Sequence, residues 1–263
     1  MEPGYYEIAS GQETLRIAGL FREGGKDLVF FIHGLGCSMD SFTGAWEAET
    51  MLPFSLLAVD LPGFGRSSKP AHYSCTMNDH ADICLAILTK FSHPRVHLVA
   101  HSMGGAVGLL MTERLGDRLI SFINVEGNLV TEDCAVSRKA ASAQLGHYRR
   151  QLLGHLRIIT AHSPERGLHH WYAGVKMSDD DGLNRSALSL VEHSCSGRLL
   201  ELFRTLPCRS AYVHGDKNAA LPVLKKLGVI PIISIENSGH FPMIDNPKTF
   251  YSRIAAFMLS PSS

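Results

Sequence analysis

Short apolar runs recur along the chain, separated by segments in which apolar and polar residues mix. The runs are continuous rather than alternating, which is typical of strands buried on both faces of a parallel sheet. Thr14–Ala18 predicts an early strand, which we expect to run antiparallel to the others. We predict the remaining strands over Leu28–Ile32, Phe54–Val59, Arg95–Ala100, Leu119–Val125, Ser210–Val213 and Val229–Ile235.

Apolar residues between these runs recur at helical spacing. From Asp79 to Phe91 they follow one another at three- and four-residue steps, as on one face of a helix, and Thr76–Asp79 resembles a capping box. Met103–Leu115 and Pro247–Leu259 predict further helices, the last with a proline near its first turn. Strands that alternate with helices predict an α/β fold with a mostly parallel, doubly wound sheet.

One long stretch, Thr131–Leu206, contains no convincing strand. It carries helical patterns at Ser137–Ile159, Gly167–Lys176, Asn184–Cys195 and Arg198–Leu206. We predict an α/β core formed by residues 1–127 and 208–263, with residues 128–207 inserted between late strands as a helical cap. A separate small helical domain is the alternative. Because sites in such sheets lie at the carboxyl ends of the strands, the position favours a cap.

Composition and charge exclude several classes of partner. Lys and Arg number 25 and so do Asp and Glu, giving zero net charge over 263 residues. A neutral chain argues against a broad nucleic-acid surface and against a polybasic membrane anchor. No early apolar run approaches the ~20 residues of a membrane span, and the first residues lack a signal-peptide pattern. We therefore expect a cytoplasmic protein, of undetermined oligomeric state, that acts on a small molecule.

The six cysteines are scattered, with no CxxC pair. An even number would permit disulfides, but a chain of this length does not need them, and we expect free thiols. Zinc is not expected without paired ligand spacing. No metal, nucleotide or other cofactor is implied.

A serine stands where a predicted strand meets a predicted helix. The sequence His97-Leu98-Val99-Ala100-His101-Ser102-Met103-Gly104-Gly105 suits a sharp strand-to-helix turn that exposes the Ser102 hydroxyl as a nucleophile. Ala100 replaces the usual first glycine of the G-x-S-x-G pattern, and alanine is small enough for the turn to survive. A serine that merely precedes two glycines is the structural alternative.

Two glycine-rich loops follow earlier strands. In His33-Gly34-Leu35-Gly36 we expect glycine to let the backbone approach a ligand closely. For acyl transfer, the Leu35 N–H would pair with the Met103 N–H as an oxyanion hole, and an ordinary turn is the alternative. The segment from Asp60 to Ser68 predicts a structural turn. No helix opens there, so it does not fit a dinucleotide-binding loop.

The candidate base is His240, in Asn237-Ser238-Gly239-His240-Phe241-Pro242 just after the last predicted strand. A general base for a serine nucleophile must lie on a loop at the same end of the sheet. The chain has 14 histidines, and His240 has the topological place that this role requires. We expect His97 and His101, which share one face of a strand, to be core residues.

These motifs, in this order and spacing, resemble the α/β-hydrolase fold family in its serine-nucleophile, esterase/lipase-like branch. The resemblance runs from about Leu28 to Leu259. It implies Ser102 as nucleophile, His240 as base, and the Leu35 and Met103 amides as oxyanion donors. A serine nucleophile argues against the epoxide hydrolase and haloalkane dehalogenase branches, which use aspartate there.

The family's third residue is a carboxylate that orients the histidine. Its usual position, in a G-x-x-D sequence after the penultimate strand, falls on Asn218 here. Asp216 is two residues earlier and would need a shifted loop. Glu126 ends the strand after the nucleophile strand, and the ends of neighbouring strands, ~4.8 Å apart, can approach one histidine. We therefore predict the triad Ser102–His240–Glu126, with Asp216 or another acid such as Asp133 as alternatives.

The predicted activity is serine hydrolysis of a small carboxylic ester, or a related acyl substrate, through an acyl-enzyme. Hydrolysis of a carbon–carbon bond on the same triad is one alternative, and a slow-turnover small-molecule receptor with a hydrolase fold is another. The predicted cap carries apolar and aromatic residues that either pack against the core or line a pocket: Tyr148, Leu152, Leu156, Trp171 and Tyr172.

Overall fold

The computed structural model describes residues 2–11, 13–142 and 147–260. Eight strands in this part form one sheet in the order β1-β2-β4-β3-β5-β6-β7-β8. β1 and β2 pair antiparallel, as do β2 and β4, and every later pairing is parallel. The strands are β1 Gly4–Ser10, β2 Glu13–Arg22, β3 Asp27–Ile32, β4 Ser55–Val59, β5 Arg95–His101, β6 Leu119–Val125, β7 Arg209–Gly215 and β8 Ile232–Ile235. The predicted mostly parallel α/β sheet is confirmed.

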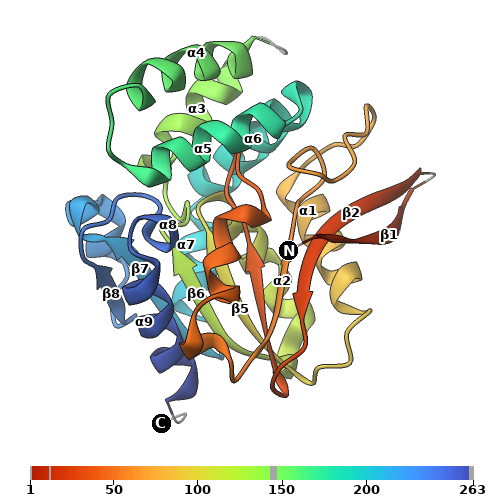
Figure 1. Cartoon of the computed structure of the whole chain (residues 1–263), viewed down its shortest axis with the longest axis vertical. Helices are drawn as coiled ribbons and strands as arrows, with labels where there is room; N and C mark the ends of the chain where they lie inside the picture. The colour runs from red at the N-terminus through yellow and green to blue at the C-terminus, as the bar shows by residue number, and fades with distance from the viewer. Residues whose placement is uncertain (1, 12, 143–146, 261–263) are drawn as a thin grey trace.

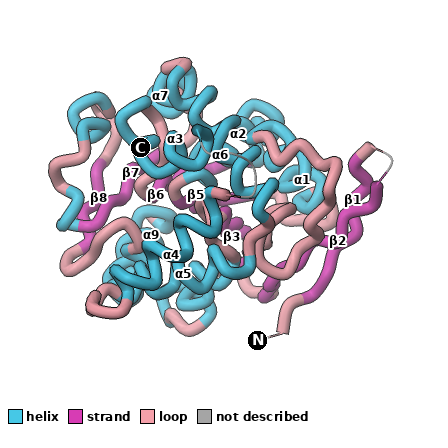
Figure 2. The backbone as a smooth tube through the Cα atoms, turned by 90° about the horizontal axis from the view of Figure 1, so that it is seen from above, coloured by secondary structure: helices cyan, strands magenta, loops and turns pink. Residues whose placement is uncertain are grey.

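Helices cover both faces of this sheet, and Figure 2 shows α1 and α2 on one side of the strands and α9 on the other. Phe30 and Phe31 on β3 are both fully buried but belong to opposite layers, because successive strand residues point to opposite faces. The core helices are α1 Met77–Leu88, α2 Met103–Leu115, α8 Pro242–Asp245 and α9 Pro247–Leu259. The 3-10 helices are η1 Met39–Trp46, η2 Glu49–Met51, η3 Gly116–Arg118, η4 Thr131–Cys134, η5 Asp216–Asn218 and η6 Pro222–Lys226.

Three strands differ from the sequence prediction. β2 runs over Glu13–Arg22 rather than Thr14–Ala18. β1 was not predicted, because its apolar residues do not form a run and only Ile8 is buried. The last strand begins at Ile232 rather than Val229. Pro231 precedes it and lacks the N–H that a ladder position would use, while Val229 is almost fully exposed. The capping box at Thr76 and Asp79 is present as predicted.

Among the described residues, five α-helices follow β6 and precede β7, and we call them the inserted helices. They are α3 Ala135–Ser142, α4 Tyr148–Thr160, α5 Arg166–Met177, α6 Asp180–Cys195 and α7 Arg198–Arg204. The single helical segment predicted over Ser137–Ile159 was wrong: α3 and α4 are separate helices, and residues 143–146 lie outside the described part. Figure 1 shows α3 to α6 gathered above one end of the sheet, whereas α7 packs against α2. The exact core and cap boundaries stay a prediction.

Polar contacts fix the inserted helices to the sheet end beneath them. On α6, the Arg185 guanidinium donates to the Tyr73 carbonyl oxygen at 2.7 Å, and the Ser189 hydroxyl accepts from the Met77 amide at 3.0 Å. On α5, the Trp171 indole N–H donates to the Leu35 carbonyl oxygen at 3.0 Å. The inserted helices therefore rest directly on the loops that carry the predicted site.

Within the described ranges, no helix is long and apolar enough to cross a bilayer. The six cysteines are free thiols, four of them buried.

Candidate active site

The parallel register brings the loops after four strands together. Ile32 on β3 pairs with Ala100 on β5, and His101 on β5 pairs with Val125 on β6. Val125 pairs in turn with Val213 on β7. Because these strands end at nearly the same level, the residues that follow them meet at the sheet end below the inserted helices.

The turn at Ser102 has the backbone conformation that the motif predicts. Ser102 connects β5 to α2 with φ 53° and ψ −120°, a left-handed conformation that is strained for a residue with a side chain. Its N–H donates to the Val125 carbonyl oxygen at 2.9 Å. A Cβ at Gly104 would lie 2.4 Å from the Ile32 carbonyl oxygen, so only glycine fits there. Ala100 is fully buried and is accommodated.

The Ser102 hydroxyl opens on a cavity of about 280 Å³, which we call the Ser102 cavity. The hydroxyl donates to the Asn128 side-chain oxygen at 3.3 Å, and the Asn128 amide donates to the Asp133 carbonyl oxygen at 2.7 Å. His240 lines the same cavity. Sequence reasoning did not single out Asn128, although it lies in the same Glu-Gly-Asn sequence as the predicted acid.

Glu126 and His240 form a direct hydrogen bond. The His240 Nδ1 lies 2.8 Å from Glu126 Oε2, and the Glu126 side chain is 2% exposed against 44% for His240. A carboxylate only accepts, so Nδ1 carries the hydrogen and Nε2 of the neutral ring keeps its lone pair. Glu126 has a positive φ of 45° directly after β6, which turns its side chain away from the strand path.

Asn218, which occupies the position usual for the acid, donates to Glu126 instead. Its Nδ2 lies 2.9 Å from Oε1 and 2.8 Å from Oε2 of Glu126, and the Gly215 N–H donates to Oε1 at 2.9 Å. The carboxylate therefore receives hydrogen bonds on both oxygens. The sequence showed only that an aspartate is missing at position 218. The structure shows that Asn218 donates hydrogen bonds to a carboxylate at the end of the neighbouring strand.

The two alternative acids are engaged elsewhere. Asp216 accepts hydrogen bonds from the Asn237 and Ser238 amides, each at 3.0 Å, and thereby shapes the loop before His240. Asp133 accepts from the Leu129 and Val130 amides through Oδ2, while its Oδ1 is buried without a partner in the described residues. Burial raises the pKa of Asp133 to about 6.

The two amides predicted to form the oxyanion hole lie at the start of α2 and in the loop after β3, at the same end of the sheet as the Ser102 cavity. Met103 is the first residue of α2, where an N–H has no acceptor within the helix. The Gly34 carbonyl oxygen accepts from the Cys37 amide at 3.1 Å. Because C=O and N–H of one trans peptide point in opposite directions, the Leu35 N–H points away from that turn. Leu35 lines the Ser102 cavity.

Glycines in this loop make room for neighbouring side chains of the protein. A Cβ at Gly34 would lie 2.9 Å from the Ser102 Cβ. Gly36 has φ 68°, and a Cβ there would lie 2.8 Å from a methyl group of Val175 on α5. The structure thus gives a packing reason for these glycines, and their predicted role in admitting a ligand stays a prediction.

His101 contacts the main chain of the candidate base, His240. Its Nε2 lies 2.8 Å from the His240 carbonyl oxygen, so Nε2 carries the hydrogen and donates it. Burial, followed by the nearby His240, lowers the pKa of His101 well below its usual value and keeps the ring neutral. The prediction of a core residue was right about burial but missed this contact, which joins positions 139 residues apart.

Other buried histidines and one aspartate hold the surrounding loops. Burial lowers the pKa of His33 to about 4 and the pKa values of His80 and His97 to about 3. Burial also raises the pKa of Asp60 to about 6. Asp60 accepts from the Met39 and Arg66 amides, each at 2.7 Å, which ties the loops after β3 and β4 together. Among the described residues there is no group of three or more His, Cys, Asp or Glu suited to a metal ion.

A model of the alpha/beta hydrolase family matches residues 29–253. The chain therefore belongs to the alpha/beta hydrolase family. An uncharacterized protein of Mycobacterium tuberculosis is 26% identical over 278 residues, which covers 94% of this chain and 78% of that protein. A probable lysophospholipase of Arabidopsis thaliana, BODYGUARD 3, is 36% identical over 100 residues, or 35% of this chain and 19% of its own length.

Solved structures with the same fold cover nearly the whole chain. A bromoperoxidase from Bacillus anthracis has a TM-score of 0.78 at 16% identity, covering 98% of this chain and 100% of that one. A thermophilic esterase from Thermogutta terrifontis has a TM-score of 0.75 at 18% identity, covering 98% of each chain. An N-acyl homoserine lactonase complexed with N-butanoyl homoserine has a TM-score of 0.76 at 19% identity, covering 99% of each. At these identities the likeness shows the fold alone.

Proposed function

We propose that this protein is a serine hydrolase that cleaves a carboxylic ester through an acyl-enzyme. Ser102 is the nucleophile, His240 the general base and Glu126 the acid that orients it. The single observation that carries the proposal is the 2.8 Å hydrogen bond from His240 Nδ1 to a buried Glu126, with Ser102 and His240 lining one cavity.

Each residue has a defined part in the proposed reaction. His240 Nε2 takes the proton as Ser102 Oγ attacks the ester carbonyl, and Glu126 stabilises the imidazolium that forms. The Leu35 and Met103 amides bind the developing oxyanion. The proton then passes to the departing alcohol, and water activated by His240 releases the acid and frees Ser102.

The Ser102 hydroxyl donates a hydrogen bond to Asn128 rather than to His240. The hydrogen bond between a nucleophile and its general base often forms only when substrate is bound. We therefore assign Asn128 a resting role: it holds the hydroxyl toward the cavity until a carbonyl carbon approaches.

Covalent labelling tests the proposal directly. A fluorophosphonate probe is expected to modify wild-type protein at Ser102 and to leave Ser102→Ala unlabelled. Steady turnover of p-nitrophenyl butyrate at ordinary rates, abolished in Ser102→Ala, supports the esterase. Absence of labelling would overturn the proposal, and a stoichiometric burst without further turnover would favour the slow receptor.

A further inference from the structure

Positive charge is concentrated in one part of this neutral chain. From Cys134 to Pro164 there are five Lys or Arg residues and no Asp or Glu. The other 232 residues then hold 20 basic and 25 acidic side chains, so this segment is the main local excess of positive charge. The segment contains α3 and α4, which are the helices above the predicted site.

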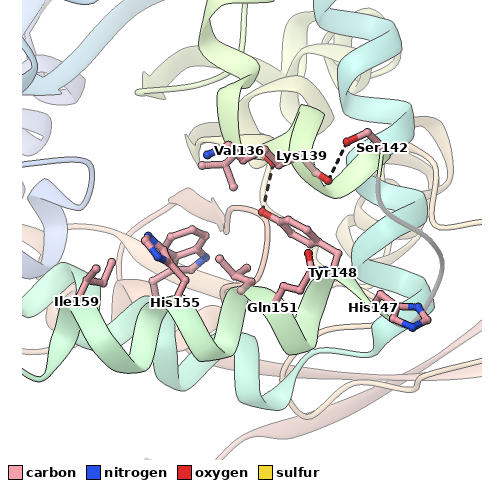
Figure 3. Close-up of a pocket in the computed structure, with 10 residues that line it drawn as sticks. Val136, Lys139, Ser142, His147, Tyr148, Gln151, His155 and Ile159 are labelled. Atoms are coloured by element: carbon pink, nitrogen blue, oxygen red, sulfur yellow. Dashed lines mark hydrogen bonds between the residues drawn. The ribbon is translucent and has the colours of Figure 1, made fainter.

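α3 and α4 border a second cavity of about 640 Å³, which we call the helical cavity. Figure 3 shows Val136 and Lys139 on α3 opposite Gln151, His155 and Ile159 on α4. Its walls are mixed, with apolar side chains together with Lys139 and His155, and none of the described residues that line it carries a carboxylate. Among the described residues, the Lys139 ammonium takes part in no ion pair.

The helical cavity adjoins the Ser102 cavity, because Val136 and Trp171 line both. The Trp171 indole also donates to the Leu35 carbonyl oxygen, so this shared wall is fixed to the predicted oxyanion loop. Lys139 is three residues beyond Val136, about 4.5 Å further along the helix axis. The acyl chain of a substrate that extends from Ser102 between Val136 and Trp171 thus reaches Lys139 within one turn of α3.

Volumes indicate how much of a substrate each cavity takes. At about 30 Å³ per water-sized group, the Ser102 cavity of about 280 Å³ holds the scissile ester and a few carbons. A longer chain must extend into the helical cavity. The acyl chain remains bonded to the nucleophile through both steps, whereas the alcohol leaves after the first. The acyl chain is therefore the longer-lived occupant of the two adjoining cavities.

We infer that the preferred substrate is an ester whose acyl chain is of medium length and ends in a carboxylate. Its apolar part passes Val136 and Trp171, and its carboxylate lies beside the Lys139 ammonium. This inference rests on the proposed function, since it places the carbonyl at Ser102. An exposed ion pair of this kind is worth up to about fivefold in an equilibrium or rate ratio at low salt.

Two esters of equal carbon number test the inference. The mono-p-nitrophenyl ester of suberic acid has a terminal carboxylate where p-nitrophenyl octanoate has a methyl group. We expect wild-type kcat/KM to favour the suberate ester about fivefold at low salt, and less at 0.5 M salt. Lys139→Gln should bring the ratio to about one, and Lys139→Glu should bring it below one.

Arg157→Gln is the matched control, because Arg157 is a cation of the same helical pair that does not line either cavity. It should keep the wild-type ratio. Equal use of both esters by the wild type, or a ratio unaffected by Lys139→Gln, would overturn the inference. An equal loss of the preference for the suberate ester in Arg157→Gln would also overturn it, because the preference would then come from the general positive charge of α3 and α4 and not from a contact with Lys139. Hydrolysis of octanoate without preference refutes only this inference, whereas no hydrolysis and no labelling of Ser102 refutes the proposed function.

Discussion

Substitution of Glu126 by glutamine removes a charge but keeps nearly the same shape, so it isolates what the carboxylate does. Each Glu126 oxygen accepts hydrogen bonds from nitrogen donors: Oε1 from Gly215 and Asn218, and Oε2 from Asn218 and His240. In either orientation, the glutamine NH₂ group therefore faces a donor. The Gly215 N–H is fixed by the backbone, so the NH₂ is expected to face His240.

That orientation forces His240 into the opposite tautomer, with the hydrogen on Nε2, where it cannot take a proton from Ser102. In a serine triad, replacement of the acid by its amide lowers kcat about 10⁴-fold. We expect Glu126→Gln to lower kcat by about 10³- to 10⁴-fold. The assay is steady-state hydrolysis of p-nitrophenyl butyrate, with circular dichroism to check folding. Near-normal kcat in Glu126→Gln, together with a large loss in Asp216→Asn, would refute the assignment.

Asn218→Asp supplies the matched second change. Alone, it places a carboxylate about where the Asn218 amide lies, 2.8 to 2.9 Å from Glu126. Two like charges at that distance repel by about 6 kcal/mol at an effective dielectric constant of 20. The two carboxylates should therefore share one proton at neutral pH. The pH profile of activity should move to higher pH, where that proton is lost. Combined with Glu126→Gln, the same change should restore activity at least about tenfold, because one carboxylate again serves the histidine.

Two stability predictions rest on the same structure. Near pH 5, unfolding lets four buried imidazoles take up about four protons; they belong to His33, His80, His97 and His101. Unfolding also lets Asp60 and Asp133 release about two protons. The unfolded state thus binds about two more protons, and the free energy of unfolding should fall by about 3 kcal/mol per pH unit on acidification. Urea titrations at several pH values measure this slope. His97→Gln should reduce the proton uptake on unfolding by about one and make the slope correspondingly shallower. An unchanged slope would contradict the reasoning. Gly104→Ala should destabilise by about 3 kcal/mol, whereas Gly154→Ala on α4, where a Cβ meets nothing within 4 Å, should stabilise by about 0.5 to 1 kcal/mol; equal effects would show that the Ser102 turn tolerates a side chain.

Local signals made most of the sheet predictable. The buried strands are continuous apolar runs, and the turn at Ser102 follows from small residues between one such run and a helical pattern. β1 escaped prediction because it lies at the sheet edge, where one exposed face leaves an irregular pattern. The separation of α3 from α4 escaped prediction because both helices carry apolar residues at helical spacing, and the isolated Gly146 between them is compatible with a continuous helical pattern.

The contacts that define the candidate site are less visible in the sequence, because they join distant positions. The expectation for Glu126 relied on two strand ends being neighbours, and the Glu126–His240 hydrogen bond spans 114 residues. The contact between Asn218 and Glu126 spans 92 residues. Neither residue has a local pattern that reveals the other. Sequence order can place a carboxylate at the correct end of a sheet, but the donors around it depend on register and loop shape.

Asn218 and Glu126 are best understood as one unit. The two side chains are in hydrogen-bond contact, and only one of them can carry a negative charge at neutral pH without strong repulsion. A carboxylate after β6 therefore requires a neutral donor in the loop after β7, and a carboxylate in that loop would require the reverse. An amide suits the loop position because it donates to both oxygens of the acid and fixes their direction toward His240. The asparagine at the usual acid position is thus the partner of a carboxylate that stands on the neighbouring strand.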